Sequence, residues 1–278
     1  MMVLMYIYTS FDGSEKKDGR ISKRFIGFFL WKLVFAWFPC RLVRARSAAD
    51  DSLDPSRRYI FAMHPHGVLA FGRITLSMLT RTWDKLFPGI QKRVLSASAA
   101  FCIPFIREAW LSTECVSADK KTAEYCLHNE DNPCSLCVYP GGHEEQLLTK
   151  THKYRFYLKN RKGFVKLALE HGAPLVPVII FGETSLYTTH ETFLPNVRHW
   201  LAKKMRLSIP VFSGWLFVLP YRVPLTGVVG RSILVPHIPH PSDDEIKHWH
   251  ARYIHEIKTL FEEEKGFHGY ADAELEIH

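Results

Sequence analysis

Residues 59–63, Tyr-Ile-Phe-Ala-Met, constrain the fold more than any other stretch of the chain. Five apolar residues in a row predict a strand that is buried on both faces, as in parallel sheets covered by helices on each side. The strand leads directly into His-Pro-His-Gly at 64–67, where a proline and a glycine fix a sharp turn. Open α/β sheets bind ligands at strand ends, so both histidines are site candidates. The alternative is a surface turn that holds two histidines.

Short apolar runs and helical patterns alternate along the rest of the chain. The expected strands are 59–63, 115–116, 136–139, 175–181 and 233–235, and the expected helices are 68–80, 120–127 and 163–171. A last helix follows Ser242-Asp-Asp-Glu245, which has the pattern of a capping box. This order predicts an α/β fold with a mostly parallel sheet flanked by helices.

The N-terminal segment, residues 1–46, combines positive charge with apolar bulk. The chain has a formal net charge of +8, and residues 16–46 account for it with nine Lys or Arg against one Asp. The apolar stretch 25–38 would span about 21 Å as a helix, less than the roughly 30 Å of a bilayer core. We therefore expect a short re-entrant or interfacial membrane anchor, with a buried amphipathic helix as the alternative. Nucleic acid is disfavoured as a partner, because the basic residues bracket apolar bulk.

Six cysteines are scattered without the spacing of a disulfide framework, which favours a reducing compartment. Cys134 and Cys137 form a Cys-x-x-Cys pair, and Cys126 and His128 lie nearby as further zinc ligands. Because this pair falls within an apolar run, we interpret its cysteines as small buried side chains and expect no bound metal.

A second candidate loop, Tyr-Pro-Gly-Gly-His-Glu-Glu at 139–145, begins where an expected strand ends. Gly141 and Gly142 allow backbone N–H groups to approach a ligand, and Glu144 and Glu145 supply carboxylates. The alternative is an ordinary turn with solvated acids.

The third candidate is Arg161-Lys-Gly163, at the start of the expected helix 163–171. Cations at a helix N-terminus oppose the helix dipole, and a bound anion would relieve that conflict. The alternative is a solvated basic turn. A histidine base, a glycine-rich backbone, a cationic helix start and a lipid-seeking N-terminus together suit transfer of an acyl group from a coenzyme A thioester to a lipid alcohol.

An ordered series of motifs, from residue 37 to the C-terminus, resembles the diacylglycerol acyltransferase type 2 family, which includes monoacylglycerol and wax-ester acyltransferases. The motifs are WFP at 37–39, HPHG at 64–67, FPGI at 87–90, PFIRE at 104–108, GG with Glu145 at 141–145, RKGFVKLAL at 161–169, VP at 176–177, FGE at 181–183, VVG at 228–230 and LEI at 275–277.

The resemblance implies that His66 is the catalytic base and that His64 shapes the site. Related glycerolipid acyltransferases carry an aspartate five residues after their catalytic histidine. Five residues after His66, residue 71 here is Phe, so this chain lacks that orienting acid. Glu145 is our candidate to orient His66 or to balance its charge.

The substrate-binding residues expected on the same basis are Gly67, Gly141 and Gly142, which would cradle an oxyanion or a phosphate. Arg161 and Lys162, with Gly163, would contact the phosphates of coenzyme A.

The resemblance further implies a fatty acyl-CoA co-substrate, no other cofactor, and a neutral glycerolipid acceptor, diacylglycerol before monoacylglycerol or a long-chain alcohol. It implies contact with membrane lipid, at the endoplasmic reticulum membrane and on lipid droplets, and leaves a homo-oligomer open. Residues 1–46 would be the membrane-anchoring segment and residues 47–278 the catalytic domain.

Two other functions fit part of the pattern. A metal-dependent hydrolase would use His64 and His66 as ligands, with His143 and Glu145 as further donors. A lipid-binding protein without catalytic activity would account for the N-terminal segment but not for the two histidines.

Overall fold

The computed structural model describes residues 12–37, 39–129, 133–190 and 211–278. Its central sheet has seven strands in the order β1-β10-β7-β2-β5-β3-β4. These strands are β1 Cys40–Arg44, β2 Ile60–His64, β3 Lys92–Ser96, β4 Cys115–Ser117, β5 Ser135–Val138, β7 Leu175–Phe181 and β10 Leu225–Val229. Two short pairs join β6 Tyr154–Phe156 to β11 Leu275–Ile277, and β8 Thr188–Thr189 to β9 Phe212–Ser213.

Helices connect most of these strands. The α-helices within the described residues are α2 Lys23–Ile26, α3 Leu30–Trp37, α4 Arg73–Ser77, α5 Thr80–Leu86, α6 Ile106–Ser112, α7 Lys120–His128, α8 Gly142–Leu148, α9 Gly163–His171 and α11 Asp243–Glu264. The 3-10 helices are η1 Ser14–Lys16, η2 Arg46–Ala48, η3 Ser98–Cys102 and η4 Glu183–Ser185.

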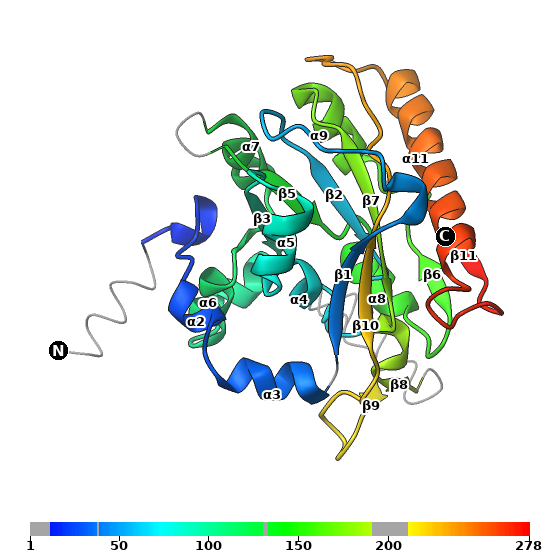
Figure 1. The fold of residues 1–278 in the computed structure, drawn as a ribbon. Coiled ribbons are helices and arrows are strands. Elements are labelled where there is room, and N and C mark those ends of the chain that lie inside the picture. Colours follow the sequence, from blue (N-terminus) through cyan, green and yellow to red (C-terminus); the bar gives the residue numbers. More distant parts are fainter. Residues whose placement is uncertain (1–11, 38, 130–132, 191–210) are drawn as a thin grey trace.

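The central sheet is parallel at every strand pair except one, because β10 runs antiparallel to β7. Helices α7, α9 and α11 supply side chains to the hydrophobic core on one face of the sheet. Helices α4, α5 and α6 supply side chains to the core on the other face. Figure 1 shows this arrangement, with α11 along one side of the sheet. The predicted α/β fold, a mostly parallel sheet flanked by helices, is confirmed.

Strand β2 shows why the run at 59–63 was informative. Ile60 and Ala62 belong to one core, while Phe61 and Met63 belong to the other, and all four are fully buried. Alternate residues of a strand point to opposite faces, so an unbroken apolar run is what a doubly covered strand requires. The expectation for this strand is confirmed.

Most of the other expected elements are confirmed as well. The expected strands 115–116, 136–139 and 175–181 correspond to β4, β5 and β7, and the expected helices 120–127 and 163–171 to α7 and α9. Gly172 ends α9 with a φ of 59°, in the left-handed region that favours glycine. The capping box of α11 is formed as predicted, since the Ser242 side chain accepts a hydrogen bond from the Glu245 N–H and the Glu245 side chain bonds back.

Two expected elements are wrong. The expected helix 68–80 is a turn followed by α4 and α5, because the Glu183 carboxylate accepts hydrogen bonds from the N–H groups of Phe71 and Gly72 and holds the chain in that turn. The expected strand 233–235 is a single bridge between Ile233 and Leu175. Strand β10 occupies this edge of β7 from Val178 to Phe181, which leaves only the start of β7 for Ile233.

Three strands of the sheet had no clear apolar pattern. Strand β3 begins with Lys92 and Arg93, which are buried because Lys92 pairs with Glu114 at 2.6 Å and Arg93 donates to the Asp18 carbonyl. Strand β10 contains Gly227, where a Cβ would come within 2.7 Å of the Thr75 hydroxyl. Strand β1 lies at the end of the basic N-terminal segment and pairs with β10.

The described part of the N-terminal segment therefore contributes η1, α2, α3 and β1 to the structure. Among the described residues, no helix is both long enough and apolar enough to cross a membrane.

Candidate active site

Three candidate loops lie together at one edge of the sheet. Strands β2, β5 and β7 are adjacent and parallel, so their carboxyl ends meet there. The loop at 64–67 follows β2, the loop at 139–145 follows β5, and Gly182 and Glu183 follow β7. This is the edge at which α/β sheets bind ligands.

His64 lies beneath the turn and is fully buried. Its Nδ1 is 3.4 Å from Glu145 Oε2, its Nε2 is 3.1 Å from the hydroxyl of Tyr253, and its ring stacks on Phe156. Both nitrogens of His64 therefore have partners within the protein. This arrangement agrees with a residue that shapes the site rather than one that meets a substrate.

His66 lies in the wall of a cavity, and its ring nitrogens are not equivalent. Nδ1 is 3.1 Å from the carbonyl oxygen of Gly67, and a carbonyl can only accept, so Nδ1 carries the proton. Nε2 is then the nitrogen with a lone pair for a substrate proton. Burial lowers the pKa of His66, while the Gly67 carbonyl and the charge of Glu145 act in the opposite direction. The imidazole is therefore neutral, as a general base must be.

Glu145 acts on the turn through the backbone. Its buried carboxylate accepts hydrogen bonds from the N–H of His66 at 2.6 Å and from the N–H of Tyr157 at 2.8 Å. A Cβ at Gly141 would collide with this carboxylate, which explains the glycine at that position. Glu145 thus fixes the position of His66 by its main chain and by charge.

A second buried carboxylate, Glu183, supports the adjoining turn before α4 and was not among the predicted site residues. It accepts hydrogen bonds from the N–H groups of Phe71 and Gly72, at 3.0 and 2.6 Å. Burial raises the pKa of Glu183 to about 8. Gly67 has a φ of 66°, and a Cβ there would collide with this carboxylate. The Phe-Gly-Glu motif after β7 was a visible signal, but only the structure shows which turn it supports.

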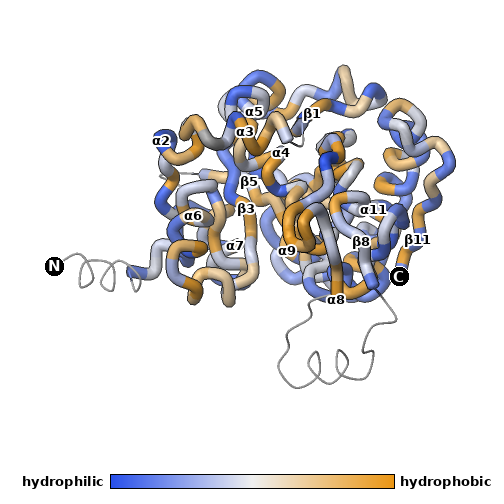
Figure 2. The backbone as a smooth tube through the Cα atoms, turned by 90° about the horizontal axis from the view of Figure 1, so that it is seen from below, coloured by the Kyte–Doolittle hydropathy of each residue, from blue (hydrophilic) through white to orange (hydrophobic). Residues whose placement is uncertain are grey.

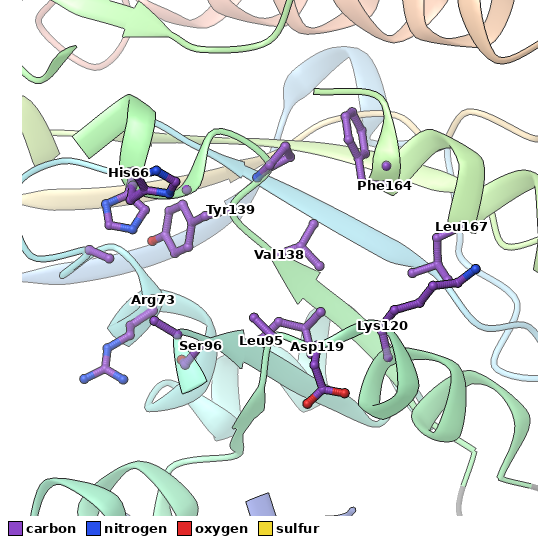
Figure 3. Close-up of a pocket in the computed structure, with 18 of the residues that line it drawn as sticks. His66, Arg73, Leu95, Ser96, Asp119, Lys120, Val138, Tyr139, Phe164 and Leu167 are labelled. Carbon is purple, nitrogen blue, oxygen red and sulfur yellow. The ribbon is translucent and has the colours of Figure 1, made fainter. Parts of the chain in front are cut away.

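The cavity has a volume of about 820 Å³ and runs between α4 and α8 at one end and α7 and α9 at the other. His66, Tyr139 and Arg73 line the first end, and Figure 3 shows them grouped together. The middle is apolar, with Leu95, Val138, Phe164 and Leu167 in its wall. The far end is charged, with Asp119, Lys120, Lys166 and Glu170. Such a cavity suits a long ligand with an apolar middle and a polar or charged end.

Of the predicted residues, His66, Gly142 and Gly163 belong to the cavity wall. Gly67 and Gly141 lie in the two turns behind it, on the buried carboxylates described above. Arg161 and Lys162 precede α9; the Arg161 guanidinium lies 5.2 Å from the centre of the Tyr157 ring. The positive charges of the wall at this end belong to Lys120 and Lys166, which sequence reasoning missed.

Tyr139 is a further residue that sequence reasoning missed. Its ring centre is 5.1 Å from that of His66, and its hydroxyl is buried without a hydrogen-bond partner among the described residues. Burial raises the pKa of Tyr139 well above its ordinary value, so the hydroxyl keeps its proton and remains a hydrogen-bond donor.

The metal-dependent alternatives find little support in these positions. In the described part of the chain, one group of three side chains has metal-ligand geometry: Glu124, Glu170 and His171. Lys120 already pairs with both glutamates, at 3.4 and 3.7 Å. The nitrogens of His64 face Glu145 and Tyr253, so they do not converge with those of His66.

The cysteines near the expected Cys-x-x-Cys pair are buried and free, as predicted for small core side chains. They are Cys126, Cys134 and Cys137.

A histidine on a glycine turn, above buried carboxylates and beside a long cavity with an apolar middle, suits acyl transfer to a lipid alcohol. The sequence model described as diacylglycerol acyltransferase matches residues 1–278. The chain belongs to the diacylglycerol acyltransferase family. It is an O-acyltransferase of lipid biosynthesis.

Relatives within the family carry three different names at similar identity. The chain is 34% identical to 2-acylglycerol O-acyltransferase 1 of Bos taurus, covering 99% of this chain and 83% of the relative. It is 33% identical to diacylglycerol O-acyltransferase 2 of Mus musculus, covering 98% of this chain and 72% of the relative. It is 32% identical to acyl-CoA wax alcohol acyltransferase 2 of Homo sapiens, covering 99% of this chain and 85% of the relative.

Among solved structures, the 1-acyl-sn-glycerophosphate acyltransferase PlsC from Thermotoga maritima aligns with 86% of this chain and 77% of its own. The TM-score is 0.47 and the identity 16%, which is too distant to add to the assignment.

Proposed function

We propose that this family member transfers the fatty acyl group of an acyl-CoA to the free hydroxyl of diacylglycerol and so forms triacylglycerol. The observation that carries this proposal is His66, whose Nδ1 proton is held by the Gly67 carbonyl while the ring lines the cavity. Relatives named for monoacylglycerol and wax-alcohol acceptors match nearly as well as those named for diacylglycerol. These two acceptors are therefore the alternatives that an experiment must separate.

The chemical step needs one base and one oxyanion site. Nε2 of His66 takes the proton of the acceptor hydroxyl while the hydroxyl oxygen attacks the carbonyl carbon of the thioester. The carbonyl oxygen becomes an oxyanion, and we assign its stabilisation to the glycine turn at 141–142, where Gly142 lies in the cavity wall. The intermediate collapses with cleavage of the carbon–sulfur bond, and coenzyme A leaves as a thiolate that takes the proton from His66. The ester and free coenzyme A are the products, with no other cofactor.

Binding of acyl-CoA would use the length of the cavity. The fatty chain would lie against its apolar middle, near Val138 and Leu167. The phosphates of coenzyme A would lie at the charged end, near Lys120 and Lys166. Arg161 and Lys162, at the start of α9, are the other candidates for this role. The two pairs can be separated by kinetics.

We place the enzyme at the endoplasmic reticulum membrane and on lipid droplets, because both the acceptor and the product are lipids. The decisive test of the reaction is an assay of purified protein with labelled acyl-CoA and each of three acceptors: diacylglycerol, monoacylglycerol and a long-chain alcohol. We expect the highest kcat/KM with diacylglycerol. A higher kcat/KM with either of the others would assign the enzyme to that acceptor.

A further inference from the structure

A short connection before β10 exposes an unbroken run of large apolar side chains to solvent. In residues 214–219, every residue after Gly214 is a large hydrophobic side chain, and all five are exposed. Leu216 is 64% exposed and Phe217 is 83% exposed. Contiguous exposed apolar residues of this kind mark an interaction site. We call residues 214–219 the apolar tip.

The apolar tip is a defined turn. Gly214 and Phe217 exchange two backbone hydrogen bonds of 3.0 and 3.1 Å, and the Leu219 N–H donates to the Trp215 carbonyl. Leu216 and Phe217 have φ values of 47° and 71°. A left-handed backbone costs a bulky residue about 1–2 kcal/mol, and glycine or asparagine would adopt it more easily. The chain therefore holds two apolar side chains outward in a conformation that disfavours them.

Helix α3 adds a second apolar surface beside the tip. Phe28 and Phe29, just before this helix, and Leu33 within it are exposed. Trp37 connects the two elements, since its ring centre is 4.7 Å from that of Trp215 and its Nε1 donates to the Pro220 carbonyl. Two segments far apart in the sequence thus form one face, which lies at the lower end of the molecule in Figure 1.

This face lies at the same edge of the sheet as His66. Strand β1 begins after α3 and β10 begins after the tip, and their first residues, Cys40 and Leu225, pair with each other. Thr226 pairs with Phe181, which ends β7 beside the turn after β2. Figure 2 looks onto this edge, with α3, α4 and α8 around it.

The charge around the face indicates what covers it. Residues 19–49 contain seven Lys or Arg and no Asp or Glu, and residues 211–242 contain no acid either. Lys23, Arg24 and Lys32 are exposed beside α3, and Arg222 is exposed just after the tip. A second copy of the chain would oppose this positive rim with its own, whereas an anionic membrane would attract it. An apolar centre with a cationic rim is typical of a surface that docks on lipid.

We propose that the apolar tip and α3 together form a docking face for an anionic lipid bilayer. The tip enters the boundary between headgroups and acyl chains, and the cationic rim contacts the headgroups. On the function proposed above, a lipid acceptor would then reach the cavity from the membrane on the same side as the catalytic turn. Membrane binding itself does not depend on that function.

Sedimentation of the protein with lipid vesicles tests the docking face directly, without acyl-CoA. The vesicles are phosphatidylcholine with or without phosphatidylserine. The test variant is Leu216→Asn/Phe217→Gly, which suits the left-handed backbone and should keep or raise the Tm. The matched control is Leu234→Asn/Phe267→Gly, which makes the same changes at exposed positions outside the face.

We expect the tip variant to partition at least about tenfold less onto vesicles, because burying a Leu or Phe side chain contributes about 1.5–3 kcal/mol each. The control variant should bind like the unchanged protein. Phosphatidylserine should strengthen binding, and salt should weaken it only in part. Lipids brominated in their acyl chains should quench fluorescence of the unchanged protein more than that of a Trp215→Phe variant.

Equal vesicle binding by the tip variant and the unchanged protein would overturn the proposal. So would a dimer that the tip substitutions dissociate while vesicle binding stays the same, because that result assigns the face to a second copy. Failure of the proposed reaction looks different. It would leave vesicle binding and its dependence on the tip intact, while no acyl transfer is detected with either vesicle-borne or detergent-dispersed acceptor.

Discussion

The two ends of the cavity differ in how firmly their polar groups are held. At the His66 end, Glu145 and Glu183 are buried and accept backbone hydrogen bonds from two turns. At the other end, the side chains of Lys120 and Lys166 are 64% and 49% exposed and pair with glutamates at 3.4 to 3.8 Å. One end is fixed before a substrate arrives, whereas the other is solvated.

This difference has an energetic consequence. Removing a buried hydrogen-bonding partner costs about 1–3 kcal/mol, whereas an exposed ion pair contributes about 0–1 kcal/mol. Substitutions at the His66 end should therefore change the rate of reaction or the folding of the protein. Substitutions at the lysine end should change binding alone.

The largest expected effect is that of His66→Ala. Loss of a general base lowers kcat by about 10²–10⁴-fold. The His66 ring lines the cavity, and its hydrogen bond goes to the carbonyl of the next residue, Gly67. Its removal should therefore change the Tm little. His64→Ala is the comparison, and it should lower the Tm because it removes one buried partner of Glu145 and one of Tyr253 and leaves a void beside Phe156. Near-normal kcat in the His66 variant would show that another group is the base.

Glu145→Gln should come next, since the amide would direct an N–H group toward a backbone N–H of Tyr157 or His66. We expect a loss of about 1–3 kcal/mol in the free energy of unfolding and a smaller loss of kcat than in the His66 variant. Denaturant unfolding and steady-state assays of one preparation measure both. An unchanged free energy of unfolding would show that this end is less rigid than its hydrogen bonds indicate.

The pH profile gives a separate test of the buried end. Burial lowers the pKa of His66 below the ordinary value of 6.5, and only the neutral ring accepts a proton. The value of kcat/KM should therefore rise with pH with its midpoint below pH 6.5, and it should level off at higher pH. A midpoint above pH 6.5 would mean that the neighbouring charge of Glu145 outweighs burial.

Sequence reasoning predicted the parts of the fold that periodicity controls. The run at 59–63 specified β2, and the helical pattern at 163–171 specified α9 at both of its ends. Strand β3 was missed because its first two residues are charged, and they are buried only through partners distant in the sequence, Glu114 and Asp18. No local pattern reveals such partners.

The candidate site was predictable where glycines and histidines stand together in a motif. The division of roles was not, because it depends on contacts between segments: His64 faces Tyr253, which comes from α11, while His66 faces the cavity. Lys120, Lys166 and Tyr139 were missed for the same reason. Each is an ordinary residue in its own segment, and it joins the cavity only when α7, α9 and β5 pack together.

The solvated end is tested by Lys120→Gln/Lys166→Gln. If each lysine contributes about 0.5–1 kcal/mol to binding of the coenzyme A phosphates, KM for acyl-CoA should rise about tenfold. The kcat and the KM for the acceptor should stay the same, because loss of uniform binding has that signature. Lys153→Gln/Lys159→Gln, outside the cavity wall, is the control. A fall in kcat would mean that this end also takes part in the chemistry.

The smallest effect is expected from Arg161→Gln/Lys162→Gln, the residues that the sequence favoured for the same phosphates. They precede α9, whose first turn contains no acid, so their charge opposes the helix dipole. Arg161 and Lys162 precede Gly163 and lie outside the cavity wall, whereas Lys120 and Lys166 are part of it. We therefore expect KM for acyl-CoA to rise less than in the Lys120/Lys166 variant.

Both pairs of variants should be assayed with each substrate varied in turn. An unchanged KM together with slightly higher stability would make this a solvated basic turn, whereas an effect larger than that of the lysine pair would move the phosphate site to the start of α9.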